Sequence, residues 1–120
     1  MTLKWIGYYK LTEENINSYV PVNAGIYRIG VELKNDKIKP IYVGQSKGLE
    51  ERMFQYLNKD TDNDCLLEHL KKHICYFKVA EVGSQSDRDA GEKALFEKFD
   101  PECNDPDKIP DVKPADINFD

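Results

Sequence analysis

The chain has 120 residues, of which 40% are hydrophobic and 32% are charged, a composition typical of one globular domain and unlike that of a disordered chain. No segment approaches the roughly 18 apolar residues of a membrane-spanning helix, and Met1–Lys10 lacks the apolar core of a signal peptide, so we expect a cytoplasmic protein without membrane contact. The formal net charge is −5, and because the charges of residues 1–99 balance, the excess lies in the segment after Phe99.

The first part of the chain predicts a β-hairpin preceded by a short helix. Leu3–Lys10 is rich in aromatic and β-branched residues and indicates a short strand or an extended lead-in. Thr12 can cap a short helix that ends at about Tyr19. Ala24–Leu33 and Lys39–Gly44 have strand-like composition and are separated by a polar turn, so together they predict a hairpin.

The second part predicts helices around one more strand. Ser46 can cap a helix with apolar residues at helical spacing, and another helix covers Asp64–His73. Ile74–Val82 has the composition of a third strand, and Ser86 can cap a long helix that ends at Phe99. This order predicts an α+β fold, with a small antiparallel three-stranded sheet flanked by helices.

We expect a single domain over residues 1–104, followed by an acidic, proline-containing tail over 105–120 that is irregular and solvated. An alternative is that this tail mimics DNA and shields the basic part of the hairpin. Residues 23–59 carry a small excess of basic side chains, which a polyanion could approach.

Five short motifs occur in a fixed order on these elements: Gly25-Ile26-Tyr27, then Tyr42-Val43-Gly44-Gln45-Ser46, then Arg52 with Tyr56, then Glu92, and finally Asn104. With this set the chain resembles the GIY-YIG endonuclease superfamily over roughly residues 23–104. The motif spacing is most similar to that of the N-terminal nuclease domain found in the endonuclease of nucleotide-excision repair. The resemblance implies the GIY-YIG nuclease fold and metal-dependent hydrolysis of a phosphodiester bond in DNA, with a role in DNA repair.

The resemblance also implies a role for each matching side chain. Tyr42 would activate the attacking water, and Arg52 would favour its phenolate and bind phosphate oxygens. Glu92 would hold one Mg²⁺ or Mn²⁺ ion, since these ions use one or two carboxylates together with water and substrate phosphate. Tyr27 and Tyr56 would position water or phosphate by hydrogen bonds.

Other residues are expected to support the site or to contact DNA. Gly44 and Asn104 would shape the site, and Lys47 together with Arg52 would contact the nucleic acid. Gln45 stands where relatives often carry a lysine, which removes a cation able to lower the pKa of a neighbouring phenol. A catalytically weak or inactive module that binds nucleic acid or a protein partner is therefore the second hypothesis. A chain of this length has no room for a separate sequence-reading domain, so specificity would come from a protein partner, a second copy or the DNA structure.

Taken one by one, the same residues have ordinary structural explanations. Tyr27 and Tyr42 suit any strand, and Arg52 with Tyr56 suits any solvated helix face. Glu92 could form a surface ion pair with Arg88 one turn earlier. Only the joint pattern favours a nuclease.

The cysteines and histidines give a separate, weaker pattern. Cys65, His69 and His73 recur every four residues on one helix face and could hold zinc, although the spacing matches no common zinc motif. We therefore favour exposed histidines and a buried thiol. With Cys75 and Cys103 the chain has three cysteines and no CxxC pair, which predicts reduced thiols rather than a disulfide framework.

Overall fold

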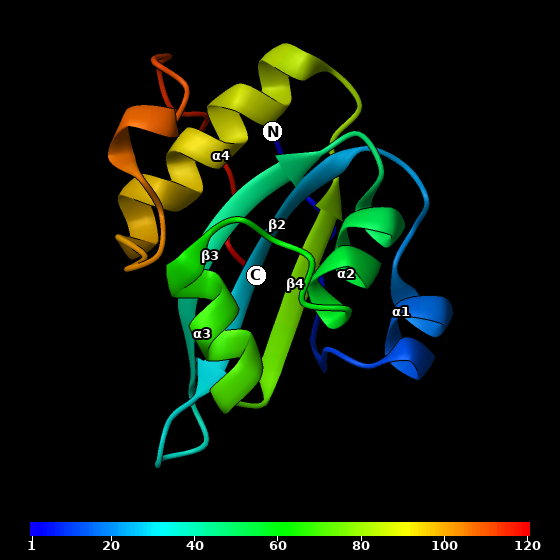
Figure 1. The fold of residues 1–120 in the computed structure, drawn as a ribbon. Coiled ribbons are helices and arrows are strands. Elements are labelled where there is room, and N and C mark those ends of the chain that lie inside the picture. Colours follow the sequence, from blue (N-terminus) through cyan, green and yellow to red (C-terminus); the bar gives the residue numbers. More distant parts are fainter.

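In this computed structural model, which describes residues 1–120, an antiparallel four-stranded sheet forms the centre of the molecule (Figure 1). Its strands are β1 (Ile6–Lys10), β2 (Gly25–Glu32), β3 (Ile38–Ser46) and β4 (Cys75–Glu81), and their order across the sheet is β1-β4-β2-β3. The expected hairpin of β2 and β3 is present, and β4 pairs with the other side of β2. The α+β class is confirmed.

The expectation of three strands is wrong, because β1 adds a fourth. It pairs with the outer edge of β4, with Ile6 opposite Val79 and Lys10 opposite Tyr76. An edge strand is covered incompletely, and the first four residues of β1 are only half-buried. Its partner lies about seventy positions later in the chain. No local pattern therefore distinguishes this strand from an extended lead-in.

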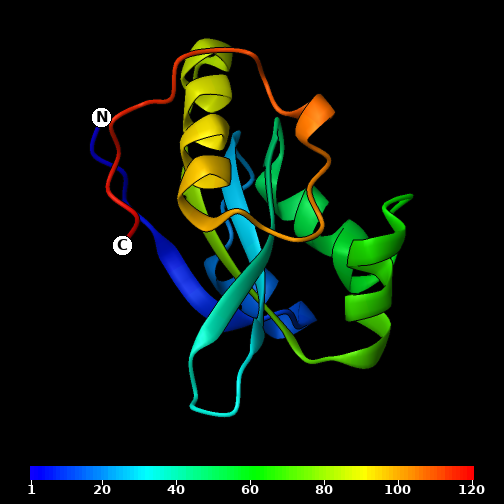
Figure 2. The same ribbon diagram turned by 90° about the vertical axis from the view of Figure 1, so that its left-hand side faces the viewer.

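The helices form one layer on each face of the sheet. Figure 2 shows α4 (Gln85–Phe99) on one side, and α2 (Leu49–Leu57) and α3 (Asp64–Lys72) on the other. α1 (Glu13–Tyr19) packs near α2, and a short 3-10 helix, Pro106–Lys108, follows α4. Two apolar cores result, one beneath α1, α2 and α3 and one beneath α4. None of the helices is long and apolar enough to cross a membrane.

The helix starts differ in part from those expected. Thr12 caps α1 as predicted, its hydroxyl accepting from the backbone N–H of Asn15. Ser46 is not the cap of α2, because it is the last residue of β3 and its Oγ accepts from the N–H of Gly48 at 3.1 Å. Ser84 rather than Ser86 caps α4. The sequence Ser-Gln-Ser offers two equally good capping residues, and the helix begins at the earlier one.

The acidic tail is not solvated over its whole length. The Asn118 side chain bonds both backbone groups of Leu3, at 2.7 Å to its N–H and 2.8 Å to its carbonyl. Trp5 Nε1 donates to the carbonyl of Asn118, and Ile117 is buried beneath α4. The tail therefore completes the second core and runs beside the N-terminal segment. Acidic composition did not reveal this, because the contacts use an amide, an aliphatic side chain and backbone groups.

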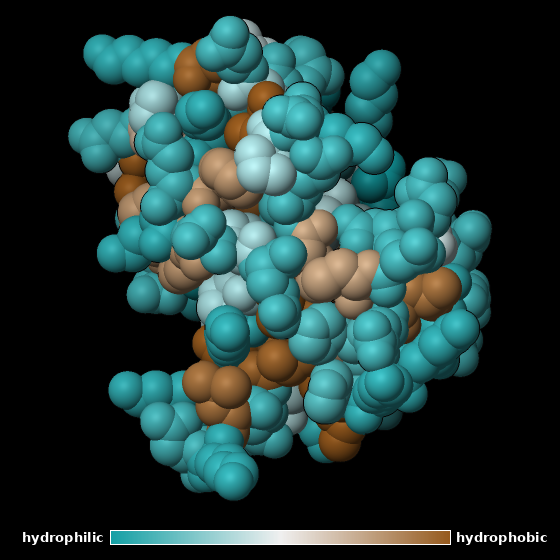
Figure 3. Space-filling view, turned by 60° about the vertical axis from the view of Figure 1, so that its left-hand side comes forward, coloured by the Kyte–Doolittle hydropathy of each residue, from teal (hydrophilic) through white to brown (hydrophobic).

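The molecular surface has little apolar area on the face shown in Figure 3. Hydrophilic side chains cover most of that face, and its hydrophobic residues gather mainly in one group in the lower half, beside a hollow at the left edge.

Candidate active site

Three tyrosines converge between the sheet and α2. Tyr27 pairs with Gly44 and Ile29 pairs with Tyr42 across β2 and β3, so both tyrosines point to the same face of the sheet. Tyr56 reaches them from α2, and its ring centroid lies 5.8 Å from that of Tyr27 and 6.4 Å from that of Tyr42. The sheet register thus builds a cluster of three phenols from residues that are distant in sequence.

Tyr27 is the buried centre of this cluster. Its hydroxyl shares a hydrogen bond of 2.5 Å with the hydroxyl of Tyr56 and accepts from Arg52 Nη1 at 3.3 Å. Its side chain is fully buried, and the open space above Gly44 accommodates its ring. A Cβ at position 44 would lie 2.5 Å from the Tyr27 hydroxyl oxygen. Gly44 is therefore required by packing, and Tyr27 contacts Tyr56 and Arg52 without lining the pocket itself.

An open pocket of about 820 Å³ lies beside the cluster. Five of the residues singled out from the sequence line it: Tyr42, Arg52, Tyr56, Glu92 and Asn104. β3 is an edge strand, so side chains from α2 on one face and α4 on the other meet around it. The pocket brings phenols, a guanidinium and a carboxylate to one surface.

Glu92 belongs to a hydrogen-bonded group of polar side chains. Gln45 Nε2 donates to Glu92 Oε1 at 2.9 Å and to Asp89 Oδ1 at 2.8 Å, and Gln85 also donates to Asp89. Burial, the largest cause, raises the pKa of Glu92, and the negative charge of Asp89 raises it further. The hydrogen bond from Gln45 lowers this pKa by less than burial raises it. The ion pair with Arg88 does not form, because the Arg88 guanidinium donates to the carbonyls of Val82 and Gly83.

Asp89 and Gln85 also belong to this group, and no motif in the sequence indicated them. Asp89 lies three residues before Glu92 on α4 and therefore on nearly the same helix face. That spacing was the one signal that could have identified it. Gln85 had no recognisable signal, since an exposed glutamine in a first helical turn is commonplace.

The phenols of the site are held in their neutral form. Burial, and then the proximity of Tyr56 and Glu92, raise the pKa of Tyr42, and Arg52 lowers it by less. Burial also raises the pKa of Tyr27 and Tyr56. Arg52 lowers the pKa of Tyr42, the direction expected, but burial raises this pKa by more, so the phenol stays neutral.

Asn104 fixes the chain at the rim of the pocket. Its Oδ1 accepts from the N–H of Val43 at 2.9 Å, and its Nδ2 donates to the carbonyl of Val43 at 2.8 Å. This pair of bonds holds the segment after α4 against β3, directly beside Tyr42. Asn104 also lines the pocket, so the same side chain both anchors this segment and borders the site.

Lys47 lies outside this pocket but next to it. A neighbouring depression of about 420 Å³ is lined by Gln45, Lys47 and Arg52, and Arg52 borders both spaces. The two residues predicted to contact nucleic acid therefore lie on adjoining parts of one surface.

The cysteines differ from expectation. Cys65 and Cys103 form a disulfide, with their Cα atoms 5.3 Å apart, and only Cys75 is free and buried. The expected reduced thiols are wrong for this pair. The two residues are 38 positions apart and meet only because α3 and the segment after α4 pack together, which spacing cannot reveal. His73 is exposed, as favoured, and His69 is half-buried.

The donor set of the pocket fits a hard divalent cation. Glu92 lines the pocket, and only its Oε1 accepts a hydrogen bond from the protein. Its second oxygen is thus free to serve as a ligand. One or two carboxylates with water and phosphate oxygens suffice for Mg²⁺, so the residues present match that ion.

Comparisons with known proteins agree with the motif pattern, although no family model matches the chain. UvrABC system protein C of Christiangramia forsetii is 35% identical over 85 residues, covering 71% of this chain and 13% of the relative. The protein of the same name from Rickettsia felis is 29% identical over 104 residues, covering 87% of this chain and 15% of the relative. The chain thus spans about one seventh of the length of these relatives.

Solved structures show the same fold. The GIY-YIG N-terminal endonuclease domain of UvrC from Thermotoga maritima, bound to magnesium as its catalytic divalent cation, superimposes with a TM-score of 0.58 at 24% identity. The match covers 77% of this chain and 93% of that domain. A substituted form of the same domain gives 0.57 over 78% of this chain. The chain therefore has the GIY-YIG endonuclease fold and is similar in sequence to UvrC, as its motifs indicated.

Proposed function

We propose that this chain is a metal-dependent endonuclease domain that hydrolyses phosphodiester bonds in DNA. The observation that carries the proposal is the shared pocket, in which Tyr42, Arg52 and Glu92 face one space. A phosphodiester is an anion that repels hydroxide, so its hydrolysis needs an activated water and positive charge near the phosphate. Phenols, a guanidinium and a metal-binding carboxylate supply these functions together.

The residues of this chain would divide the work as follows. Arg52 binds a phosphate oxygen and orients the scissile group. Tyr42 accepts a hydrogen bond from the attacking water, and it would remove the proton of that water once cationic charge near the phenol offsets the burial that raises its pKa. Tyr56, held by Tyr27, positions the same water or a phosphate oxygen. Lys47 contacts the DNA backbone beside the site.

Glu92 would hold a Mg²⁺ or Mn²⁺ ion, which supplies Lewis-acid stabilisation of the leaving oxygen when bound. Gln45 orients the carboxylate by donating to one oxygen. The Gln45 amide carries no charge, in contrast to the lysine common at this position. We therefore propose slow intrinsic turnover that depends on a protein partner or a second copy, in line with the name of the relatives as part of a UvrABC system.

Nicking of a supercoiled plasmid tests the proposal. We expect relaxation only with added Mg²⁺ or Mn²⁺, and at least about 100-fold slower cleavage by Glu92→Gln, because a neutral amide holds the cation poorly. Glu97→Gln is the matched control, since Glu97 is exposed on the same helix and outside the pocket.

The two hypotheses give different results in this assay. Equal cleavage by Glu92→Gln and Glu97→Gln, or cleavage in excess chelator, would contradict the catalytic role. DNA binding that persists in both variants without any turnover would favour the second hypothesis, a nuclease-like binding module. The second hypothesis rests on Gln45, a neutral residue at a position where relatives often carry a lysine.

A further inference from the structure

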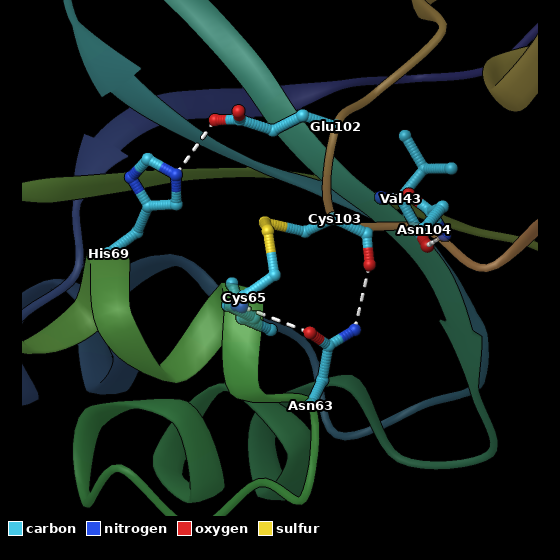
Figure 4. The surroundings of a disulfide bond; sticks show 8 residues. Val43, Asn63, Cys65, His69, Glu102, Cys103 and Asn104 are labelled. Atoms are coloured by element: carbon cyan, nitrogen blue, oxygen red, sulfur yellow. Dashed lines mark hydrogen bonds and ion pairs between the residues drawn. A yellow bond between two sulfur atoms is a disulfide. The ribbon is translucent and has the colours of Figure 1, made fainter.

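A second group of potential metal ligands does not include Glu92, although one of its members, Cys103, lines the same pocket. One ligand atom each from Cys65, His69 and Cys103 lies within 4.8 Å of the others. Figure 4 shows His69 and Cys65 projecting from α3 toward Cys103, which comes from the segment after α4. Two sulfurs and an imidazole nitrogen are ligands that zinc prefers. Mg²⁺, a hard ion, prefers oxygen ligands and does not use such a set.

The backbone around these ligands is held by several independent bonds. Cys65 and His69 are one turn apart on α3, and Asn63 caps that helix. The Asn63 side chain also donates to the carbonyl of Cys103 at 2.8 Å, and the N–H of Cys103 donates to Ile41 at 2.9 Å. The ligands therefore stay near one another whether or not the sulfurs are bonded.

A fourth donor is in reach. Glu102 Oε1 lies 2.7 Å from His69 Nε2, on the side of the imidazole that faces the sulfurs (Figure 4). Zinc is bound by cysteine sulfur, histidine nitrogen and carboxylate oxygen, and most protein sites hold it with four ligands. A carboxylate that already contacts the His69 imidazole is near enough to reach the same ion.

We propose that Cys65, His69 and Cys103, with Glu102 as the fourth ligand, form a zinc site when the two cysteines are reduced. A phosphine or thiol reductant gives two electrons, and two protons are taken up, so the disulfide becomes two thiols. Zinc binding then releases both protons as the thiolates coordinate. Zn–S bonds of about 2.3 Å in a tetrahedron place the sulfurs about 3.8 Å apart, a separation that χ rotation reaches from Cα atoms 5.3 Å apart.

The test is a Co²⁺ titration of the whole chain, reduced with a phosphine under argon. Excess Mg²⁺ is included to saturate the oxygen site at Glu92. We expect one Co²⁺ per chain with thiolate charge-transfer absorption and the visible bands of a tetrahedral site, both displaced by one equivalent of Zn²⁺. The oxidised protein should show neither band.

Two pairs of variants locate the ligands. Cys103→Ser should abolish the charge-transfer band, whereas Cys75→Ser should retain it, because the Cys75 thiol is outside the cluster. His69→Gln should weaken metal affinity by about tenfold or more, and His73→Gln should not. His69→Gln keeps both cysteines and can be purified in the disulfide form, so it remains informative if Cys103→Ser fails to fold.

Several results would overturn the proposal. The first is the absence of a charge-transfer band in the reduced protein. The others are a band that persists in Cys103→Ser and a band that is lost in Cys75→Ser. Equal affinities of His69→Gln and His73→Gln would remove the histidine from the site. The catalytic role of Glu92 does not enter this experiment, so either proposal can fail alone.

Discussion

Gly44 and Tyr27 form a pair in which the absence of a side chain at one position leaves room for the ring at the other. Across the hairpin, a Cβ on residue 44 would lie 2.5 Å from the Tyr27 hydroxyl oxygen and 2.6 Å from Cζ. Tyr27 cannot retreat, because its side chain is fully buried and hydrogen-bonded to Tyr56. The glycine of the second motif is thus a packing requirement of the phenol cluster.

Gly44→Ala should therefore destabilise the fold by about 1–3 kcal/mol, the usual cost of overpacking. It should also lower cleavage, because the Tyr27 ring must move away from Tyr56. Urea unfolding measures the first effect, and plasmid nicking measures the second. Gly83→Ala is the control, since nothing lies within 4 Å of a Cβ at position 83. Equal stability of the two variants would contradict the proposed contact.

The buried phenols predict a loss of stability at high pH. Burial first, and neighbouring phenols second, raise the pKa of Tyr27, whereas in the unfolded chain a phenol titrates near 10. The folded state thus binds more protons above this pH. The stabilisation is complete below about pH 10 and falls as pH rises, by up to about 1.4 kcal/mol per pH unit for each such phenol.

Urea midpoints measured from pH 8 to pH 11 should therefore decrease above about pH 10. Tyr27→Phe should flatten this decrease, even though it lowers stability at neutral pH by removing the hydrogen bond to Tyr56. Tyr19→Phe, on the exposed side of α1, controls for the removal of one phenol. An unchanged slope in Tyr27→Phe would show that Tyr27 does not carry the effect.

At the scale of the elements, the start of α4 offers a direct test of the capping assignment. Ser84 Oγ accepts from the N–H of Asp87 at 3.2 Å, whereas the Ser86 side chain forms no hydrogen bond. Ser84→Ala should cost about 1 kcal/mol of unfolding free energy, and Ser86→Ala should cost almost nothing. Thermal unfolding of both variants compares them directly. Equal losses would mean that the helix starts elsewhere.

Elements with a local signal were predictable from the sequence. α1 has a capping threonine and a following acidic turn, and the β2–β3 hairpin has two strand-like runs around a polar turn. β1 had a comparable composition, but its place in the sheet depends on pairing with β4 far along the chain. The type of each element could therefore be predicted from the sequence, but the pairing of β1 at the edge of the sheet could not.

The same distinction applies to the site. The matching motifs brought Tyr42, Arg52 and Glu92 to attention, and their common pocket follows from the fold. Gln45 was noticed as a departure, but its two hydrogen bonds to carboxylates need the packing of α4 against β3. The pairing of Cys65 with Cys103 also arises only in three dimensions.

At the scale of the whole molecule, the C-terminal end of the tail packs against the central sheet. Arg28 is buried against the rings of Trp5 and Phe99 and donates to the carbonyl of Phe119 at 2.7 Å. Asp120 accepts from Lys78 at 2.7 Å. The tail thus satisfies polar groups on the face of the sheet opposite the phenol cluster. Its last residues support the domain there, whereas its first part lines the pocket with Asp105, Lys108 and Ile109.

Asn118→Ala should lower the free energy of unfolding by about 1–3 kcal/mol, because it leaves the backbone groups of Leu3 without their partners. Cleavage at a temperature well below the unfolding transition should change little, since the pocket lies elsewhere. Asn17→Ala, at an exposed position of α1, is the control and should be neutral or slightly stabilising. A neutral Asn118→Ala would mean that the tail is not held by this side chain.

The tip of the hairpin, residues 33–37, projects into solvent, while Tyr27 and Gly44 pair near its opposite end. Two extra residues on each strand would lengthen the projecting ribbon and leave the paired positions of the site as they are. The number of residues between Tyr27 and Tyr42 can therefore change where both strands lengthen together. Sequences that share these motifs should therefore be sought with a variable number of residues between the positions of Tyr27 and Tyr42, provided that the pairing of Tyr27 with Gly44 is kept.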